Sequence, residues 1–332
     1  MVSGTNIVEG IWYGRSPWKS VLVPISVLYG VVVGIRMGLY RRRIFRSIKI
    51  PVPLVIVGNL TVGGTGKSPL VISLVQLLVN AGYSPGVVSR GYRSRATDAP
   101  KLVCSSTDFF TVGDEPIVIS RETGVSVVVD SDRVRGAQYL VNECGVDIII
   151  SDDGLQHLRM DRNVEIVVID GERRFGNGLL LPAGPLREST KRLESVDFIV
   201  TNGGEPLKGE YRMRTELGDA VNIKTGEKCN LSRFQSVGII AVAGIARPDK
   251  FFSDLRSVGL QPEVRKFPDH HQYGISDLVD LKQATVLMTA KDAVKCERIA
   301  GPNWWVVPQL VKIESSFERE LLDNLHNVRE CN

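Results

Sequence analysis

The feature that most constrains the fold is a glycine-rich segment between two apolar runs. Residues 54–58 read LVIVG, the next residues read NLTVGGTGKSP, and an apolar, helix-length segment runs from Leu70 to Val79. This order predicts a buried strand, a phosphate-binding loop and a helix. Glycines let backbone N–H groups close around phosphate oxygens, and the N-terminus of the helix adds partial positive charge. In such a loop Lys67 reaches the β- and γ-phosphates and Ser68 ligates Mg²⁺, so the segment predicts a nucleoside triphosphate site.

The match to the usual pattern is imperfect. The pattern G-x-x-x-x-G-K-[ST] has a glycine where this chain has Thr61, and the surplus glycines are Gly63 and Gly64. A glycine-rich turn also occurs as a tight connection between two elements. The Lys-Ser pair directly after the last glycine, with a strand before it and a helix after it, favours the phosphate loop.

Apolar runs alternate with helical stretches up to about residue 201. The predicted strands are 54–57, 85–88, 126–129, 147–150, 165–169 and 197–200. Their continuous Val and Ile content, without polar alternation, is typical of a parallel sheet covered on both faces. The predicted fold class is therefore α/β, with a parallel sheet core like that of phosphate-loop NTPases.

A second α/β pattern follows a polar, alternating stretch. It comprises predicted strands at 237–242 and 286–289, a helix at 250–258 and a C-terminal helix after Ser315. At 332 residues two domains are expected. We predict an N-terminal segment (1–46), a phosphate-loop core (47–205), a β linker (206–232) and a smaller C-terminal α/β lobe (233–332), with a cleft between the lobes.

The N-terminal segment contains an uncharged run that predicts a membrane-associated helix. The run extends from Ser20 to Ile35, with Trp18 and Lys19 before it and arginines 36 and 41–43 after it. Aromatic and basic flanks are typical of a membrane interface, with the arginines on the cytoplasmic side. Sixteen residues fall short of the ~20 that cross a bilayer, so the helix spans with its flanks or lies in the interface. A buried core helix with a basic end is the alternative.

Charge and cysteine content exclude several classes of protein. Eight Lys and Arg residues lie in residues 1–50 against Glu9 alone, which leaves 33 basic and 36 acidic residues elsewhere. The body of the chain therefore has no basic excess for a nucleic-acid partner. Five scattered cysteines without a C-x-x-C pair indicate neither a disulfide framework nor a zinc site, which suits a reducing cytosol.

Candidate catalytic residues follow the predicted strands and turns. The segment DIIISDD ends with Asp152 and Asp153, where P-loop proteins place a magnesium-binding aspartate, and Gln156 and His157 come next. GDEP places two acids on a short loop, which is also typical of a capped turn before a predicted helix at 117–121. Arg187 ends the rigid turn LPAGPLR, where it either neutralises phosphoryl charge or caps a helix.

The remaining motifs are less specific. The segment SRGYR follows a strand and offers Arg90 for phosphate or sugar binding. Two of the four histidines are adjacent in FPDHH, where a general acid–base role or the orientation of a carboxylate is more plausible than a metal site. The segment 289–292 ends another predicted strand and suggests no role.

Seven segments resemble one known family, the tetraacyldisaccharide 4′-kinases of lipid A synthesis in Gram-negative bacteria. They are VPLVIVGNLTVGGTGKSP, VVSRGYRS, GDEP, SDDGLQH, VEIVVIDGERRFGNGLLLPAGPLRE, FPDHH and TAKDAVKC, and they follow the Trp-flanked helix in the expected order. Together they cover nearly the whole chain. The resemblance also accounts for the irregular phosphate loop, because that form is the family's own.

The resemblance implies ATP- and Mg²⁺-dependent phosphorylation of the 4′-hydroxyl of a tetraacylated glucosamine disaccharide 1-phosphate, giving lipid IVA. Asp114 would be the base, His270 its partner, and Lys67 and Arg187 further catalytic groups; His271 receives no role. The implied ATP-binding residues are Thr61, Gly63, Gly64, Thr65, Gly66, Lys67, Ser68, Gln156 and His157. The implied metal ligands are Ser68, Glu115, Asp152 and Asp153. Arg133 would assist phosphoryl positioning and, with Arg90 and Tyr92, substrate binding.

The expected partners are the acylated lipid substrate and the cytoplasmic face of the bacterial inner membrane, with no nucleic acid and no obligate protein partner. Two rival functions also fit part of the sequence. A membrane-partitioning ATPase would carry lysine where this chain has Val62. A soluble small-molecule kinase would not need the apolar N-terminal segment. Both differences favour the lipid kinase.

Overall fold

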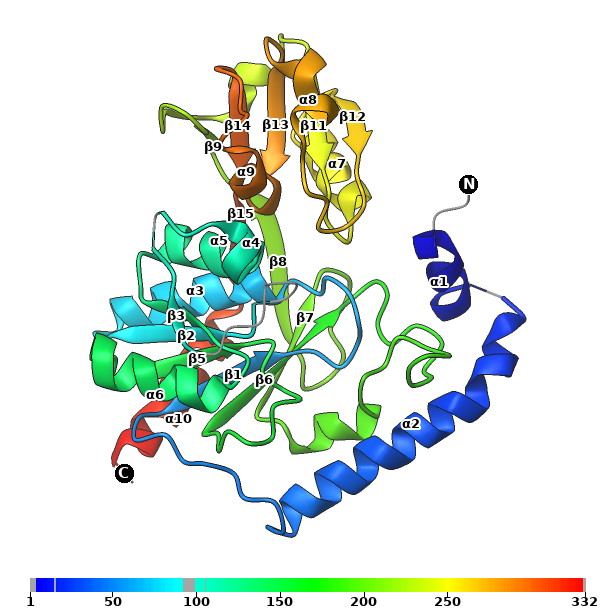
Figure 1. Cartoon of the computed structure of the whole chain (residues 1–332), viewed down its shortest axis with the longest axis vertical. Coiled ribbons are helices and arrows are strands. Elements are labelled where there is room, and N and C mark those ends of the chain that lie inside the picture. Colours follow the sequence, from blue (N-terminus) through cyan, green and yellow to red (C-terminus); the bar gives the residue numbers. More distant parts are fainter. Residues whose placement is uncertain (1–3, 15, 92–98, 105, 331–332) are drawn as a thin grey trace.

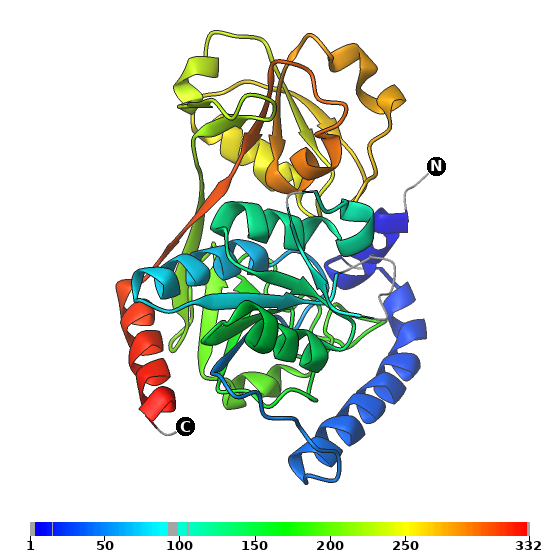
Figure 2. The same ribbon diagram turned by 60° about the vertical axis from the view of Figure 1, so that its left-hand side comes forward.

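The chain forms two α/β lobes joined by a two-stranded ribbon (Figure 1). The computed structural model describes residues 4–14, 16–91, 99–104 and 106–330. The larger lobe lies below the ribbon in Figure 1 and the smaller lobe above it, while a long helix from the N-terminal segment runs along the larger lobe. The turned view of Figure 2 shows the ribbon passing between the two lobes.

The larger sheet places the phosphate loop at its centre. Among the described residues it has nine strands in the order β15-β8-β7-β6-β1-β5-β2-β4-β3. Their bounds are β1 (Leu54–Gly58), β2 (Pro85–Ser89), β3 (Lys101–Leu102), β4 (Val127–Val129), β5 (Ile148–Asp152), β6 (Val164–Asp170), β7 (Phe198–Asn202), β8 (Tyr211–Leu217) and β15 (Gln309–Ile313). Strand β1 pairs in parallel with both β5 and β6, and Val57 lies opposite Asp152. The loops after β1 and β5 therefore leave the sheet at the same edge.

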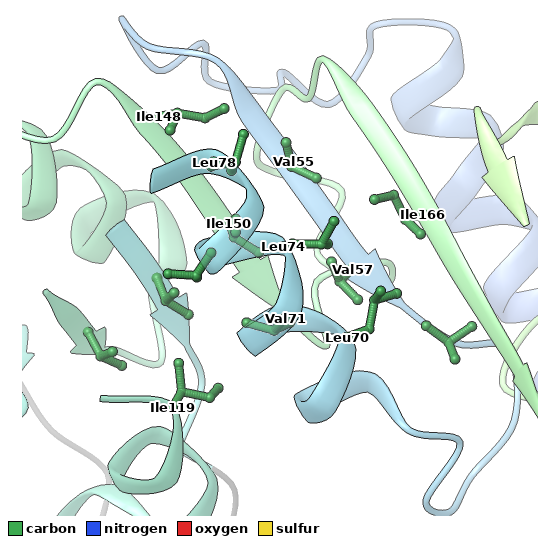
Figure 3. Close-up of a cluster of buried hydrophobic side chains, with 14 of the residues drawn as sticks. Val55, Val57, Leu70, Val71, Leu74, Leu78, Ile119, Ile148, Ile150 and Ile166 are labelled. Carbon is green, nitrogen blue, oxygen red and sulfur yellow. The ribbon is translucent and has the colours of Figure 1, made fainter. Parts of the chain in front are cut away.

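Helices cover this sheet on both faces, which explains the uninterrupted apolar strands. They are α3 (Lys67–Asn80), α4 (Phe109–Val112), α5 (Asp114–Thr123), α6 (Arg133–Cys144) and α10 (Ser315–Glu330), with a 3-10 turn η1 (Thr190–Ser195). Val55 of β1 belongs to one buried cluster, while Leu54 and Ile56 belong to the other. Successive strand residues point to opposite faces, so a strand covered on both sides is apolar throughout. Figure 3 shows Leu70 and Leu74 of α3 packed over β1 and β5.

The smaller lobe is built on a second, mostly parallel sheet. Among the described residues its order is β10-β9-β14-β13-β11-β12. The bounds are β9 (Ala220–Asn222), β10 (Lys228–Cys229), β11 (Ile239–Ala243), β12 (Glu263–Lys266), β13 (Thr285–Thr289) and β14 (Trp304–Val307), with α7 (Pro248–Ser257), α8 (Ile275–Leu278), α9 (Ala290–Cys296) and the 3-10 turns η2 (Leu231–Phe234) and η3 (Val279–Leu281). Helix α9 starts directly after β13 and faces the larger lobe (Figure 1).

The sheets do not follow two of the predicted boundaries. Strand β15 pairs antiparallel with β8 in the larger sheet, and Phe317 and Leu321 of α10 are buried in the same cluster as α3. The C-terminal residues from β15 onward therefore return to the larger lobe and are not part of a lobe spanning 233–332. Only β8 of the predicted linker lies in the ribbon, because β9 and β10 pair within the smaller sheet. Polar alternation marks an antiparallel strand but does not reveal which sheet it joins.

The N-terminal segment forms two helices, α1 (Gly4–Trp12) and α2 (Trp18–Arg41). Helix α2 has 24 residues, which is longer than the uncharged run, and it is apolar and long enough to cross a membrane. Most of its apolar side chains are exposed, including Val21, Leu28 and Val32. The alternative of a buried core helix is wrong, since Ser26 alone of the residues in this fully described helix is buried.

Candidate active site

The phosphate loop has the backbone shape that its glycines predict. Gly63 and Gly66 have φ of 116° and 96°, a region that residues with a Cβ rarely adopt. Gly66 is also the N-cap of α3, and no side chain that the structure describes caps that end. The first N–H groups of α3 therefore have no side-chain acceptor at the cap, as at an anion site. Asn202 Nδ2 donates to the carbonyl of Thr65 over 3.0 Å and so fixes the loop against β7.

This loop lines a cavity of about 310 Å³ between the two lobes. Residues 62–69 form one wall, and Ile245, Ala246 and Lys291 of the smaller lobe contribute to the opposite wall. A Cβ on Gly64 would lie 3.4 Å from Cβ of Ala246, so the smaller lobe closely approaches the loop. The predicted cleft between the lobes is thus the place where a nucleotide's phosphates would lie.

Asp153 links the phosphate loop to Arg187. Lys67 Nζ lies 3.4 Å from Asp153 Oδ1, and Arg187 Nη1 donates to both carboxylate oxygens at 2.9 and 3.0 Å. Burial alone would raise the pKa of Asp153, but the charges of Lys67 and Arg187 outweigh burial and lower it. Both cations also line the cavity, so they are held on one carboxylate beside the phosphate site.

Asp152 is a buried carboxylate that lacks a partner among the described residues. It is 1% exposed, and no group in that part of the chain donates a hydrogen bond to either carboxylate oxygen. Burial, followed by the nearby charges of Glu115 and Asp153, raises the pKa of Asp152 to about 7. A buried orphan carboxylate costs free energy that a cation would recover, so this residue fits a divalent metal ion.

The other predicted metal ligands lie around Asp152 but do not form a ready cage. Ser68 is buried in the first turn of α3. Glu115 forms an ion pair with Lys291 of the smaller lobe, whose charge lowers the pKa of Glu115 despite its burial. Among the described residues no three His, Cys, Asp or Glu side chains group as metal ligands. Such an open arrangement suits Mg²⁺, which is usually held by one or two carboxylates together with phosphates and waters.

The predicted base and its partner meet across the cleft. Asp114 begins α5, and its Oδ2 lies 3.1 Å from His270 Nδ1 in the smaller lobe. The other oxygen accepts a hydrogen bond of 2.9 Å from the backbone N–H of Glu115. Burial raises the pKa of Asp114, but the hydrogen bond with His270 and the charges of Lys291 and Lys295 lower it overall. The same hydrogen bond raises the pKa of His270.

The start of α5 differs from the prediction. Asp114 and Glu115 lie in its first helical turn, so the helix begins three residues before the predicted start at residue 117. Gly113 precedes it as the N-cap with φ of 87°, and none of the described side chains caps this end. The helix dipole favours acidic residues in a first turn, which explains the position of Asp114 and Glu115. Because Gly113 is the N-cap, neither acid caps the helix as the alternative of a capped turn would require.

Gln156 and His157 support the site without lining the cavity. Gln156 Nε2 donates to the carbonyl of Asn59 and to Glu188 Oε1, while its Oε1 accepts from Arg187 over 3.3 Å. The pKa of His157 is lowered to about 4 by burial and by the charge of Arg133, so the ring is neutral at pH 7. Gln156 therefore holds Arg187 in place and is not part of the cavity wall that the phosphate loop forms.

The three residues predicted to bind the lipid lie in different environments. Arg90 is exposed directly after β2, and Tyr92 lies outside the described residues. Arg133 is 5% exposed and donates to the carbonyl of Asp153 over 2.7 Å. Arg133 therefore supports the backbone of Asp153 and does not itself line the cavity.

Two lysines of α9 belong to this site although the sequence assigned them no role. Lys291 pairs with Glu115, and Lys295 lies 3.6 Å from Asp114 and 3.3 Å from Asp292. The signal available in the sequence was their position, because both follow the carboxyl end of a predicted strand, where ligands bind in α/β sheets.

Fold and site together define a phosphate-loop phosphotransferase in which a carboxylate and a histidine meet across an interlobe cleft. The sequence profile of the tetraacyldisaccharide-1-P 4′-kinase (LpxK) family matches residues 18–326, and the chain belongs to this family. The chain is 44% identical to the tetraacyldisaccharide 4′-kinase of Nitrosococcus oceani over 97% of this chain and 95% of that protein. It is 43% identical to the enzyme of the same name from Vibrio cholerae, with 98% of each chain covered.

A solved structure confirms the predicted fold class. The crystal structure of LpxK from Aquifex aeolicus, described as an "apo" form in complex with ATP, superposes with a TM-score of 0.81 at 28% identity. The match covers 93% of this chain and 99% of that chain. The family resemblance drawn from the sequence motifs is likewise confirmed.

Proposed function

We propose that this chain transfers the γ-phosphoryl group of ATP to the 4′-hydroxyl of a tetraacylated glucosamine disaccharide 1-phosphate, giving the 1,4′-bisphosphorylated precursor of lipid A. The observation that best supports this proposal is the contact of 3.1 Å between Asp114 and His270. It lies next to the phosphate-loop cavity of a chain that belongs to this kinase family. The 4′ oxygen bonds to the γ-phosphorus, the bond between that phosphorus and its bridging oxygen breaks, and ADP leaves.

The phosphate loop binds the triphosphate in this proposal. Backbone N–H groups from Gly63 to Ser68, which line the cavity, surround the phosphates, whereas the Val62 N–H already donates to the carbonyl of Pro185. Lys67 contacts the β- and γ-phosphates. Ser68, Glu115, Asp152 and Asp153 are the residues that would hold Mg²⁺, of which unpartnered Asp152 is the best supported. When bound, Mg²⁺ neutralises charge on the phosphate oxygens.

Asp114 accepts the proton of the attacking hydroxyl. Its lowered pKa keeps the carboxylate ionised at pH 7, and His270 holds one of its oxygens in place. A carboxylate with a lowered pKa is a weak base, which is sufficient because phosphoryl transfer through a loose transition state needs little proton removal early in the reaction. Alignment of the hydroxyl is then the larger contribution.

Arg187 and Lys67 stabilise the charge on the group in transfer. Both are held on Asp153 and both line the cavity, so a phosphoryl group entering the cavity meets two fixed cations. Cations already in place cost no reorganisation when charge moves in the transition state.

Helix α2 places this site at a membrane in the proposal. Its exposed apolar side chains would lie in lipid, and the basic cluster at its C-terminal end would lie at the cytoplasmic face of the bacterial inner membrane. A substrate with four acyl chains remains in the bilayer, so an enzyme that acts on its headgroup has to work at that surface.

The test is a phosphorylation assay with the purified full chain, ATP, Mg²⁺ and the disaccharide lipid in vesicles. We expect ADP release that depends on the lipid, a lipid product heavier by one phosphoryl group in mass spectrometry, and a new monoester at the 4′ position by ³¹P NMR. ATP hydrolysis without lipid, together with an unmodified lipid, would contradict the proposal and favour a nucleotide-switched ATPase. Activity on a water-soluble sugar would favour a soluble kinase.

A further inference from the structure

Helix α2 has a second face that contacts the larger lobe. Ser26, Tyr29 and Gly30 lie at spacings of three and four residues, so they share one side of the helix. This side packs against the loop 177–187 between β6 and η1, whereas Val27, Leu28 and Val31 are exposed. Figures 1 and 2 both show α2 running along the larger lobe.

The contacts between α2 and this loop are specific. The backbone N–H of Ala183 donates to Ser26 Oγ over 2.9 Å, and both groups are buried. Tyr29 donates its hydroxyl hydrogen to the carbonyl of Arg187 over 3.0 Å. A Cβ on Gly30 would lie 2.7 Å from Cδ1 of Leu180, so the helix backbone approaches the loop closely.

Helix α1 also makes hydrogen bonds with this loop. Trp12 Nε1 donates to the carbonyl of Pro182 over 3.0 Å. Asn177 Nδ2 donates to the carbonyl of Ile11 over 3.1 Å and to that of Ala183 over 2.8 Å. Both N-terminal helices are thus bonded to a segment that ends at Arg187.

Arg187 connects this loop to the phosphate site. Its backbone N–H donates to the carbonyl of Leu60, the residue before the phosphate loop, over 2.6 Å. Its guanidinium contacts Asp153, which in turn lies 3.4 Å from Lys67. The residue whose carbonyl Tyr29 holds is therefore the residue that brings a cation to the cavity.

We infer that helix α2 positions the phosphoryl-binding arginine, and that Tyr29, Ser26 and Gly30 are positioning residues for the reaction. The inference rests on the proposed function. Misplacement of a charged group by a fraction of an ångström weakens its contact with the transition state more than its contact with the bound nucleotide. The helix therefore affects turnover as well as membrane attachment.

Two pairs of matched variants separate these roles. Gly30→Val adds a side chain against Leu180, whereas Gly34→Val makes the same change where a Cβ meets nothing within 4 Å. Tyr29→Phe removes the hydroxyl that donates to Arg187, and Tyr40→Phe removes a hydroxyl elsewhere on the same helix. All four are made in the full chain and assayed in vesicles of one composition that contain the disaccharide lipid.

Tyr29→Phe should lower kcat about three- to tenfold, the effect of losing about one neutral hydrogen bond. Gly30→Val displaces the helix from the loop and should lower kcat at least as much. The KM for ATP and co-flotation with vesicles should match those of the Gly34→Val and Tyr40→Phe controls. Wild-type kcat in both test variants would overturn the inference. A loss of flotation equal to the loss of kcat would also overturn it, because attachment alone would then explain the effect.

Amide hydrogen exchange gives a readout that does not depend on turnover. Exchange in the peptide covering 177–187 should accelerate in Gly30→Val and remain unchanged in Gly34→Val, because the helix no longer packs on the loop. Unchanged exchange in both variants would overturn the inference even if the wild-type chain phosphorylates the lipid. A wild-type chain that does not phosphorylate the lipid would overturn the proposed function. The exchange result would still show whether α2 packs on the loop 177–187.

Discussion

The two walls of the interlobe cavity are built in different ways. On the phosphate-loop wall, Lys67, Asp153 and Arg187 come from the larger lobe alone and contact one another there. On the other side, Glu115, His270 and Lys291 line the cavity, and Asp114 lies directly behind them. Asp114 and Glu115 at the start of α5 obtain their partners from the smaller lobe, namely His270 and two lysines. One wall is organised within a single lobe, and the other is organised only where the lobes meet.

This difference assigns different tasks to the two walls. Groups that are held within one lobe bind phosphate without any movement of the protein. Groups that are completed across the cleft depend on the relative position of the lobes, so they are suited to the chemical step rather than to initial binding. Substitutions on each wall should therefore have different effects on ATP binding and on turnover.

The largest effect is expected on the phosphate-loop wall. Lys67→Met removes a cation that lines the cavity, and we expect kcat/KM for ATP to fall on the order of 10³-fold, with weaker ATP binding, because the ammonium contacts the triphosphate before and during transfer. Steady-state kinetics and calorimetric ATP titration measure both quantities. Lys208→Met, at an exposed position, is the control. If Lys67→Met retained its ATP affinity, groups outside this wall would have to contribute to nucleotide binding.

The acid–base pair should separate binding from turnover. Asp114→Asn keeps the shape of the side chain but removes the charge next to His270, and we expect kcat to fall about 10²-fold. ATP affinity should barely change, because Asp114 does not line the phosphate-loop wall. Single-turnover kinetics and equilibrium ATP binding provide the comparison. A variant that turns over at the wild-type rate would remove Asp114 from its proposed role.

The ion pair across the cleft should affect the response to magnesium. Lys291→Met frees Glu115, and the Mg²⁺ concentration for half-maximal rate should fall about three- to tenfold, because a cation no longer competes for that carboxylate. A magnesium titration at fixed ATP measures this concentration, with Lys266→Met as the control on a surface pair with Asp249. An increased magnesium requirement would instead mean that Lys291 organises the metal side of the site.

The same division explains how much of the site the sequence could predict. Lys67, Ser68 and the Asp152–Asp153 pair belong to local motifs that follow predicted strands, and parallel strands bring their carboxyl ends to one edge. The pairing of Glu115 with Lys291 joins residues 176 positions apart. No local pattern specifies it, because it depends on how two separately folded sheets meet.

The fold shows a similar limit. The apolar strands of the larger sheet were predicted because burial on both faces leaves a composition that is visible locally. The return of β15 to β8 was not predicted, since pairing of Ile313 with Met213 depends on register between distant segments. The contact between α2 and Arg187 could not be predicted either. The sequence does not indicate which distant residue a hydroxyl group in an apolar run will bond.

The smallest effect concerns an ion pair held within the larger lobe, away from the cleft. Hydrogen bonds from Arg174 and Thr201 outweigh burial and lower the pKa of Glu210 from 4.5 to about 2. A carboxylate whose folded-state pKa is below its unfolded value contributes stability that is present above pH 4.5 and is lost as pH falls toward 2. Glu210→Gln should therefore lower Tm slightly at pH 7, and the difference from wild type should shrink as pH falls through this window.

Calorimetric scans between pH 3 and pH 7 measure this difference in Tm. Glu205→Gln is a suitable control, because Glu205 pairs with Arg212 at the surface and is far more exposed. The kcat of Glu210→Gln should remain near wild type, because its partners do not reach the cavity. A gap in Tm that stays constant with pH would mean that Glu210 stabilises the lobe by packing, and a large loss of kcat would show that the larger lobe is less independent of the site than its contacts indicate.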